Sequence, residues 1–260
     1  MSKKRQPRKT RRSNSRVLVR SFAVRYTVDH KIGAHAHDWH QLIYASEGVL
    51  WVHTAQGDWV VPPNRAVWVP AGVRHGIDMS GPVFVQTLYF ARNVPDPLPD
   101  RCCAVNVAPL LRELIRHTIT LGMLDESDPA HARLVGVLID QLAVMTTIPL
   151  QLPWPVDERA QRVAAWLRDH ADNPGVIKQL ARKAALSART LERLFRRETG
   201  LTFGRWRQQL RLLQALRLLA AGRSVTATAS GVGYESPSAF ISMFRRTLGV
   251  TPHRYFGRPD

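Results

Sequence analysis

The first part of the chain alternates short apolar runs with Gly, Pro and Asp. Between residues 22 and 90 these runs are rich in β-branched and aromatic residues. Closely spaced runs of this kind are typical of antiparallel strands in a sandwich or a small barrel. We therefore predict a β-domain over residues 17–106. Its clearest strands are expected at residues 41–45, 49–54, 59–61, 66–69 and 83–90.

After Pro109 the apolar positions recur at steps of three and four, on both sides of a loop at residues 125–129. This spacing predicts two amphipathic helices over residues 107–148. The helices either cover the barrel or pair with those of a second subunit, and we expect a contact in a homodimer. Three prolines then predict a stiff linker over residues 149–156, because each proline removes a backbone donor and disfavours helix before it.

From residue 157 onward nearly every apolar residue fits a helical period. A short helix, a turn and a second helix capped by Ser187 form one helix-turn-helix pattern at residues 177–198. The same pattern recurs at residues 225–248, where Ser236 is the expected cap. The sequence therefore predicts an all-α domain over residues 157–260 that contains two helix-turn-helix motifs.

A longer helix connects these two motifs. Thr202 is well placed to cap it and Gly222 to end it. About eighteen residues at 1.5 Å each give a length of ~27 Å. Because one turn of B-DNA is ~34 Å long, the second helices of the two motifs are expected to enter successive major grooves on one face of a duplex.

The formal net charge of +17 is distributed unevenly. Residues 1–16 carry eight Lys or Arg and no acid, residues 17–150 carry ten against twelve Asp or Glu, and residues 151–260 carry nineteen against eight. A near-neutral middle and a basic end indicate that a polyanion binds the end. The tail over residues 1–16 lacks apolar periodicity, so we expect it to be disordered, either as a solubilising arm or as an accessory DNA-binding arm.

Two further features narrow the function classes. No apolar run is long enough to cross a bilayer, and the basic N-terminus lacks the hydrophobic segment of a secretory signal. We therefore expect a cytoplasmic protein without a membrane partner. Cys102 and Cys103 are adjacent, which suits neither a long-range disulfide nor a CxxC pair, and we expect them to be packing thiols.

Three histidines and a glutamine in the β-domain have the spacing of a ligand site. His35 and His37 alternate as residues on one face of a strand do, and Gln41 follows four residues later. His75 ends a PxGxxH segment, and both segments resemble the two cupin motifs. Cupins more often have Glu at the position of Gln41. The resemblance implies a cupin-like barrel with these side chains facing inward.

This predicted site leaves three alternatives open. It can be a pocket for a small-molecule effector, with Trp51 and Trp68 as further lining residues. It can be the same pocket with a divalent metal such as zinc, nickel, iron or manganese bound by His35, His37 and His75. It can also consist of structural histidines without a ligand.

The basic C-terminal domain resembles the DNA-binding domain of the AraC/XylS family of transcriptional regulators. The resemblance rests on LARKAALSARTLERLFRRETG and on GVGYESPSAFISMFRRTLGVTPHRYF, the second of which is the family signature. By this resemblance, bases are contacted by four residues in each motif, namely Arg189, Thr190, Glu192 and Arg193 in the first and Ser236, Ser238, Ala239 and Ser242 in the second.

Among these residues, the arginines are the strongest candidates for sequence recognition, because a guanidinium can hold guanine O6 and N7 together. We expect Arg189 and Arg193 to do so. Phosphate contacts are expected from Ser187, Arg197, Arg245 and Arg246. Two positions depart from the family pattern, since Thr228 replaces a usual aliphatic residue and the second motif offers small side chains. The second motif is therefore expected to position the protein more than it specifies the sequence.

The predicted fold class is α+β and multidomain, with a cupin-like antiparallel β-barrel, two following helices and a C-terminal all-α domain. The resemblance implies a regulator that binds double-stranded promoter DNA under the control of an effector in the barrel, with RNA polymerase as a further partner if it activates transcription. Two alternatives are a metal-dependent cupin enzyme, for which no paired general acid and base is visible, and a nucleoid-type DNA binder driven by charge.

Overall fold

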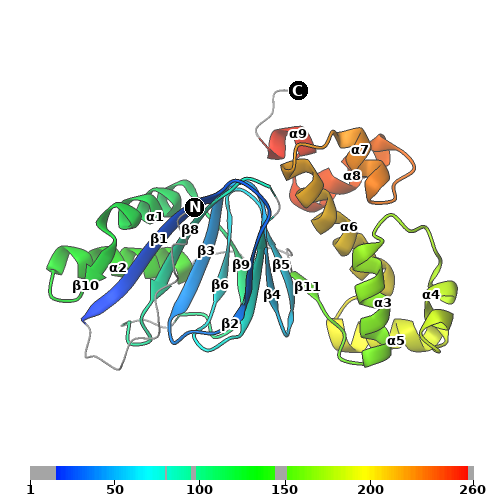
Figure 1. Ribbon diagram of the computed structural model, residues 1–260, viewed down its shortest axis with the longest axis horizontal. Helices are drawn as coiled ribbons and strands as arrows, with labels where there is room; N and C mark the ends of the chain where they lie inside the picture. The colour runs from blue at the N-terminus through cyan, green and yellow to red at the C-terminus, as the bar shows by residue number, and fades with distance from the viewer. Residues whose placement is uncertain (1–15, 80, 95–97, 144–150, 257–260) are drawn as a thin grey trace.

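The computed structural model describes residues 16–79, 81–94, 98–143 and 151–256. A domain of two β-sheets with two helices is followed by a helical domain (Figure 1), which confirms the predicted fold class. The predicted tail up to residue 15 and the segment 144–150, where the predicted helical segment ends and the linker begins, lie outside the described residues. Within the described ranges, no helix is long and apolar enough to cross a membrane.

The strands form two antiparallel sheets. The first contains β1 (Val17–Tyr26), β3 (His40–Glu47), β6 (Arg65–Val69), β8 (Val83–Phe90), β9 (Cys103–Asn106) and β10 (Met123–Asp125). The second contains β2 (His30–His35), β4 (Leu50–Thr54), β5 (Gly57–Val61), β7 (His75–Met79) and β11 (Gln151–Pro153). Their orders are β10-β1-β8-β3-β6-β9 and β11-β5-β4-β7-β2. The five segments predicted as strands correspond to β3, β4, β5, β6 and β8.

The six-stranded sheet is apolar on both faces. On β3, Leu42 and Tyr44 belong to the cluster that includes buried residues of α1 (Pro109–Leu121) and α2 (Pro129–Ala143). Ile43 belongs to the other cluster, together with residues of the five-stranded sheet. Because neighbouring residues of a strand point to opposite faces, the helices bury one face of this sheet and the second sheet buries the other. The two helices therefore cover the barrel.

The helical domain contains two similar halves. Its elements are α3 (Glu158–Asp169), α4 (Ile177–Lys183), α5 (Ala188–Thr199), α6 (Phe203–Ala220), α7 (Val225–Gly231), α8 (Pro237–Leu248) and α9 (Pro252–Tyr255). The pairs α4–α5 and α7–α8 occupy the segments predicted for the two helix-turn-helix motifs. The short helix α9 was not among the elements predicted from the sequence.

Four of the described helices in this domain begin with a hydroxyl side-chain cap. The hydroxyl of the cap residue accepts a hydrogen bond from the backbone N–H three residues later, at 3.0–3.2 Å in every case. Such a cap stabilises a helix by about 1 kcal/mol. The cap residues are Ser187 for α5, Thr202 for α6, Ser224 for α7 and Ser236 for α8.

The two domains meet at a strand that the sequence predicted as part of a linker. Residues Gln151–Pro153 form β11, which pairs with β5 at the edge of the five-stranded sheet. The indole N–H of Trp206 on α6 donates to the Pro153 carbonyl at 2.7 Å, and the Gln209 amide donates to the Gln151 carbonyl at 2.9 Å. Carbonyls of an edge strand need partners, and α6 supplies them here. This part of the 149–156 segment is therefore built into the barrel.

The outer face of the five-stranded sheet is also buried around β11, β5 and the start of β4. Trp51 is 5% exposed and Val60 and Leu152 are 0% exposed, although all three lie on the face opposite to the barrel interior. On the same face His53 Nδ1 lies 2.7 Å from an oxygen of the buried Asp58. Figure 1 shows the helical domain on this side of the barrel, so the sheet is packed between the barrel interior and that domain.

Thr228 on α7 is fully buried, and its hydroxyl has no hydrogen-bond partner among the residues that the structure describes. Leaving a buried hydroxyl unpaired costs about 1–3 kcal/mol. We expect Thr228→Val, which keeps the shape of the side chain, to raise the free energy of unfolding by about 1 kcal/mol. Denaturant unfolding of both proteins measures this change.

Thr118 provides a matched control, because it is equally buried but its hydroxyl donates to the Leu114 carbonyl at 2.8 Å. Thr118→Val is expected to lower the free energy of unfolding by about 1 kcal/mol. A loss of stability in Thr228→Val as large as that in Thr118→Val would mean that the Thr228 hydroxyl is paired after all.

Candidate effector site and DNA-binding surface

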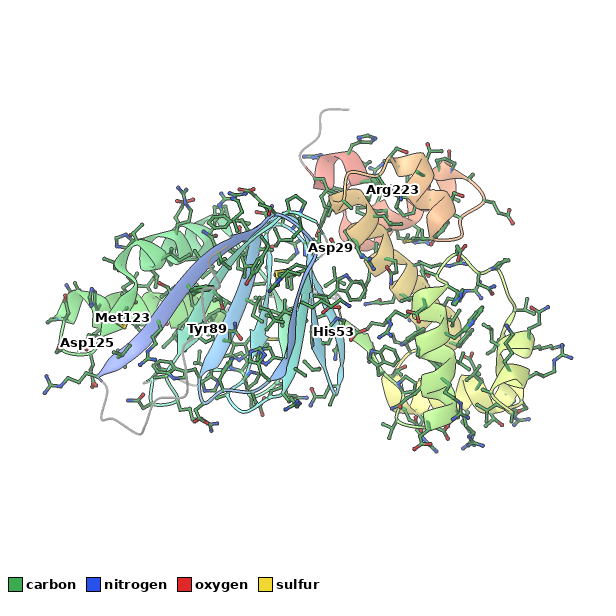
Figure 2. All side chains as sticks on the ribbon, in the orientation of Figure 1. Asp29, His53, Tyr89, Met123, Asp125 and Arg223 are labelled. Carbon is green, nitrogen blue, oxygen red and sulfur yellow. The ribbon has the colours of Figure 1, made fainter. Side chains whose placement is uncertain are left out.

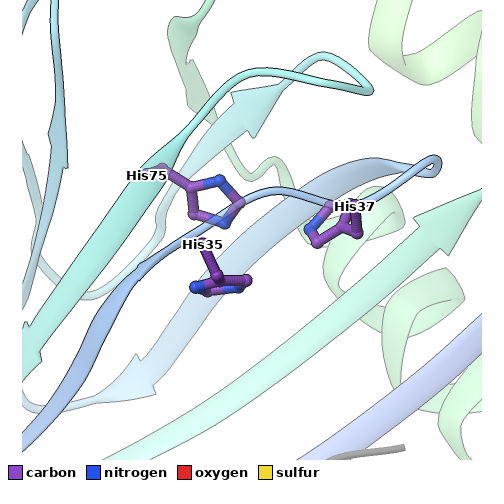
Figure 3. A group of neighbouring side chains, drawn as sticks. All are labelled: His35, His37 and His75. Carbon is purple, nitrogen blue, oxygen red and sulfur yellow. The ribbon is translucent and has the colours of Figure 1, made fainter. Parts of the chain in front are cut away.

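Three imidazoles meet at one end of the barrel (Figure 3). The ring centroids of His35 and His75 are 4.5 Å apart, and those of His37 and His75 are 5.2 Å apart. One ring nitrogen from each histidine lies within 4.8 Å of the other two. His75 is buried, whereas His35 and His37 are partly exposed, so the cluster is open on one side. The predicted convergence of the three rings is confirmed.

The expectation that His35 and His37 lie on one strand and alternate along it is wrong, however. The strand β2 ends at His35, and His37 lies in the following turn. Its ring reaches the cluster because its Nδ1 is held 2.7 Å from the Trp39 carbonyl. His37 is therefore positioned by a local turn and not by the period of a strand.

Gln41 connects the imidazoles to the barrel wall. Its Oε1 lies 3.0 Å from Nε2 of both His37 and His75. Its amide nitrogen donates to Thr87 Oγ1 at 3.0 Å and to the Tyr89 hydroxyl at 3.1 Å. Because the Thr87 hydroxyl itself donates to the Leu42 carbonyl, it must accept from Gln41. This bond fixes the amide, with its carbonyl oxygen directed at the histidines.

The other ring nitrogens are held by the backbone. Nδ1 of His35 lies 3.0 Å from the Gly33 carbonyl, and Nδ1 of His75 lies 3.0 Å from the Val73 carbonyl. A carbonyl only accepts, so Nδ1 carries the proton, as it does in His37. In a neutral ring Nε2 then has a lone pair. Oε1 of Gln41 and the Nε2 atoms of His37 and His75 are consequently acceptors that face one another.

Burial changes the acid–base behaviour of this site. Together with the neighbouring His35 and His37, it lowers the pKa of His75 to about 4. Burial also raises the pKa of Tyr89 to about 12. At neutral pH His75 is therefore an uncharged imidazole and Tyr89 an uncharged phenol.

Trp51 and Trp68 were predicted to line this site, and the structure places them elsewhere. On β4, Thr54 pairs with His75 and therefore shares its face, so Trp51 points to the opposite, outer face. On β6, Val69 pairs with Gln41, so Trp68 points away from the barrel interior into the cluster under α1 and α2. Both indoles are core residues of outer faces. The residues that sequence analysis missed are Thr87 and Tyr89.

A cavity of about 390 Å³ adjoins the imidazole cluster, and His75 is among its lining residues. The walls come from β2, β4 and β7 and from the segments next to them, and they include Arg74 and Asp78. The lining also includes His53, which like Asp78 points to the outer face of the sheet, so the hollow extends onto the face opposite to the imidazole rings. It belongs to the same end of the barrel as the cluster.

The predicted base-contacting residues of α5 are accessible. Arg189 and Arg193 are exposed, and Glu192 is half-buried. The Thr190 hydroxyl lies 2.9 Å from the Ser187 hydroxyl, so these two side chains also serve the helix cap. The buried side of α5 consists of Leu191, Leu194 and Phe195, which fixes the arginines on the outer side. The geometry therefore leaves the guanidinium groups of Arg189 and Arg193 accessible to a DNA duplex.

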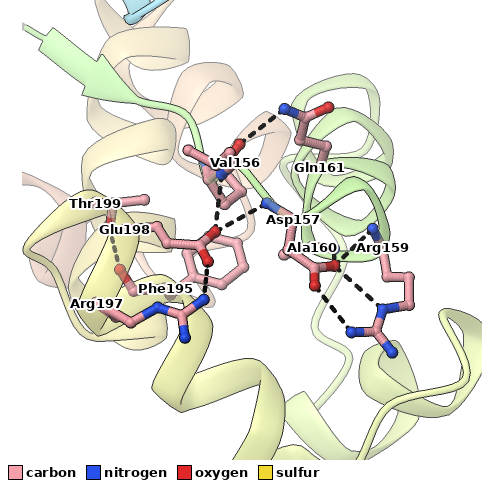
Figure 4. A network of polar contacts seen from close by, with 10 residues as sticks. Val156, Asp157, Arg159, Ala160, Gln161, Phe195, Arg197, Glu198 and Thr199 are labelled. Atoms are coloured by element: carbon pink, nitrogen blue, oxygen red, sulfur yellow. Dashed lines mark hydrogen bonds and ion pairs between the residues drawn. The ribbon is translucent and has the colours of Figure 1, made fainter.

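Arg197 lies at the other end of α5, where it is paired with the Glu198 carboxylate (Figure 4). The other oxygen of Glu198 accepts from the backbone N–H groups of Val156 and Asp157, at 2.8 and 2.9 Å. Burial alone would raise the pKa of Glu198, but these hydrogen bonds and Arg197 lower it below its usual value. Glu198 therefore ties the start of α3 to the end of α5, and it holds Arg197, which was predicted to contact phosphate, at that place.

The second motif presents smaller side chains. Ser238, Ala239 and Ser242 are exposed on α8, and so are Arg245 and Arg246 near its end. Ser236 is exposed as well, but its hydroxyl caps α8 by accepting from the Ala239 N–H at 3.2 Å. The structure thus brings the predicted residues of this motif onto the accessible part of one helix.

Comparison with known proteins identifies the family. The profile of the AraC-like ligand binding domain matches residues 22–188, and that of a helix-turn-helix domain matches residues 180–258. The chain belongs to the AraC family of transcriptional regulators. Members of this architecture combine a ligand-binding N-terminal domain with a DNA-binding helix-turn-helix domain, and the two parts of this AraC-family chain correspond to them.

Individual relatives cover different shares of this AraC-family regulator. The HTH-type transcriptional regulator NimR of Escherichia coli (strain K12) is 35% identical over 224 residues, 86% of this chain and 82% of its own length. The transcriptional activator RhaS of Escherichia fergusonii is 38% identical over 97 residues, 37% of this chain and 35% of its own. The crystal structure of the AdpA DNA-binding domain with target DNA is 37% identical, covers 38% of this chain and 90% of that one, and has a TM-score of 0.37.

Proposed function

We propose that α5 and α8 enter two successive major grooves on one face of promoter DNA. The observation that carries this proposal is the connecting helix α6, whose 18 residues give a length of ~27 Å. Each motif has a capped second helix with exposed polar or basic side chains. In this proposal Arg189 and Arg193 hold bases, and Arg245 and Arg246 hold phosphates.

The predicted roles of two arginines can be separated by mutation. We expect Arg193→Ala to lose about 1–3 kcal/mol of discrimination at one or two base positions, because a bidentate guanine contact is removed. Arg246→Ala is expected to weaken binding to all sequences alike and to reduce the slope of log K against log salt by about 1. Selection of bound sequences from a random pool, followed by titrations at several salt concentrations, measures both effects.

Each variant serves as the control for the other, since both remove one exposed arginine from a helix-turn-helix motif. Equal changes of base preference in Arg193→Ala and Arg246→Ala would show that neither residue has the role assigned to it. A wild-type protein that selects no sequence at all would instead favour a DNA binder driven by charge alone.

A second proposal concerns the imidazole cluster, where we infer a divalent metal ion. His35, His37 and His75 each place one ring nitrogen within 4.8 Å of those of the other two, and the Gln41 carbonyl oxygen faces two of these rings. Acceptors that face one another without a donor are unfavourable, and a cation between them removes the conflict. Three neutral imidazoles and a carbonyl oxygen suit zinc, nickel or iron.

The bound ion would offer an oxygen or nitrogen donor of an effector a coordination position on the open side of the cluster, where His35 and His37 are partly exposed. The chain's own groups hold the site together, with Nδ1 of each ring bonded to the backbone and Gln41 bonded to Thr87 and Tyr89. An amide at position 41 does not exchange protons as a carboxylate does. We therefore propose that the site binds its effector without turnover.

Metal binding can be tested on the full chain after treatment with a chelator. We expect calorimetric titration with zinc to give one ion per chain, and His75→Ala to weaken binding by about 100-fold or more, since a ligand is lost. Gln41→Glu is expected to tighten binding, because a carboxylate replaces a neutral oxygen. His53→Ala, which removes a histidine of the outer face, should leave the affinity unchanged. Zinc binding that His75→Ala does not weaken would refute the site.

The barrel surface far from the helical domain suggests a second copy of the chain as partner. Leu121 and Met123 are 41% and 57% exposed at the end of α1 and on β10, and Val137 on α2 is 41% exposed. Figure 2 shows Met123 at the end of the barrel opposite the helical domain. We propose that these apolar residues are covered in a homodimer, because α1, α2 and β10 contact one another and exposed apolar side chains on neighbouring elements mark interaction surfaces.

Leu121→Glu tests this contact. We expect sedimentation equilibrium to show about a tenfold weaker self-association, equivalent to ~1.4 kcal/mol, because a charge would be buried in the interface. Thr120→Glu places the same charge on the neighbouring exposed residue and should have a smaller effect. A wild-type protein that stays monomeric at the concentrations used for DNA binding would overturn this proposal.

A further inference from the structure

Arg211 occupies the middle of α6 and binds a loop of the first half of the helical domain. Its Nε donates to the Ala171 carbonyl at 3.1 Å, and its Nη2 donates to the Asn173 carbonyl at 3.2 Å. Both carbonyls belong to the loop that follows α3. A guanidinium has five donors in a fixed plane, so one side chain can hold several carbonyls at once.

The same guanidinium also contacts the turn of the second motif. Its central carbon lies 5.8 Å from the ring centroid of Tyr234, between α7 and α8. The preceding Gly233 has φ +76, and a Cβ built on it would lie 2.5 Å from Arg211 Nη2 and 2.6 Å from the Asp172 carbonyl oxygen. The turn of the second motif thus packs directly on Arg211 and on the loop of the first half, at a distance that only glycine allows.

A neighbouring arginine, Arg207, contacts the same loop through a different carbonyl. Arg207 lies one helical turn earlier on α6, and it donates to the Gly175 carbonyl at 2.6 Å. Burial lowers the pKa of both Arg207 and Arg211, so both guanidinium groups are partly desolvated. The structure gives Arg207 no contact with residues 233–234 among its described interactions. Arg211 therefore differs from it in bridging the two halves.

We infer that Arg211 is a positioning residue that sets the half-site spacing of the operator, by clamping the loop after α3 against the Gly233–Tyr234 turn. A helix alone is a connector that bends, and a clamp at its middle restricts the angle between the motifs. The inference rests on the proposed insertion of both α5 and α8 into DNA. A groove of about 400 Å³ beside the clamp is lined by Arg211, Tyr234 and Arg246, so direct contact of Arg211 with phosphate is the competing role.

The test uses the full chain and an operator obtained by selection, with the distance between half-sites changed by one base pair in either direction. One base pair moves the second half-site by about 3.4 Å and rotates it by about 35°. We expect the affinity of the wild-type protein for the altered operators to be roughly tenfold or more below its affinity for the selected operator, which is the value of one lost bidentate base contact. Arg211→Ala is expected to reduce this penalty to about threefold or less. Affinity for an operator with one half-site scrambled should be the same for both proteins.

Two further variants separate the clamp from other roles. Arg207→Ala should lower the melting temperature as Arg211→Ala does but keep the wild-type penalty for altered spacing. Arg211→Lys retains the charge without the planar group, and we expect it to lose spacing discrimination like Arg211→Ala. Gly233→Ala, which forces the halves apart, should shift the preferred spacing or relax it.

The outcomes are distinguishable. If Arg211→Ala weakens binding at every spacing by the same factor and Arg211→Lys restores it, Arg211 contacts phosphate and the inference is wrong. If Arg207→Ala relaxes the spacing as much as Arg211→Ala, general loosening of the domain explains the effect and the inference is also wrong. If the wild-type protein shows no spacing dependence, the proposed use of both motifs fails, and the inference fails with it.

Discussion

The packing of α6 constrains both functions of this regulator. Its buried residues, which include Trp206, Leu210 and Leu213, fill the core shared by the two helix-turn-helix motifs. Its first turns donate hydrogen bonds to carbonyls of β11, an edge strand of the barrel. A change in the direction of α6 would therefore move the DNA-binding helices relative to each other, or the whole domain relative to the barrel, or break buried hydrogen bonds.

This arrangement gives the barrel a physical means of influencing DNA binding. The strand β7 carries His75 on its inner face and Asp78 on the outer face, which is the face that is buried towards the helical domain. A ligand at the imidazole cluster alters DNA affinity only if the protein can hold the helical domain in two positions. The affinity of the protein for the ligand must also differ between these two positions. The five-stranded sheet, with the ligand site on one side and the DNA-binding domain on the other, is the layer through which such a difference would act.

Local signals in the sequence were sufficient for the helical domain and insufficient for the barrel. The caps Ser187 and Ser236 bond to backbone N–H groups three positions away, and they were predicted together with the helices that they start. The faces of Trp51 and Trp68 depend on strand register, and a shift of one residue exchanges inside and outside, so their assignment to the pocket was wrong. The pairing of β11 and the contacts of Arg211 join segments far apart in the chain, and no local pattern encodes them.

The central claim is that one chain contacts two consecutive turns of DNA on one face. Guanine methylation interference on the selected operator, with the full-length protein at moderate salt, measures this most directly. The account predicts two groups of guanines whose N7 methylation in the major groove interferes with binding, separated by about 10 base pairs on the same face of the duplex. A single group of interfering positions per bound chain, with the neighbouring turn insensitive to methylation, would contradict it.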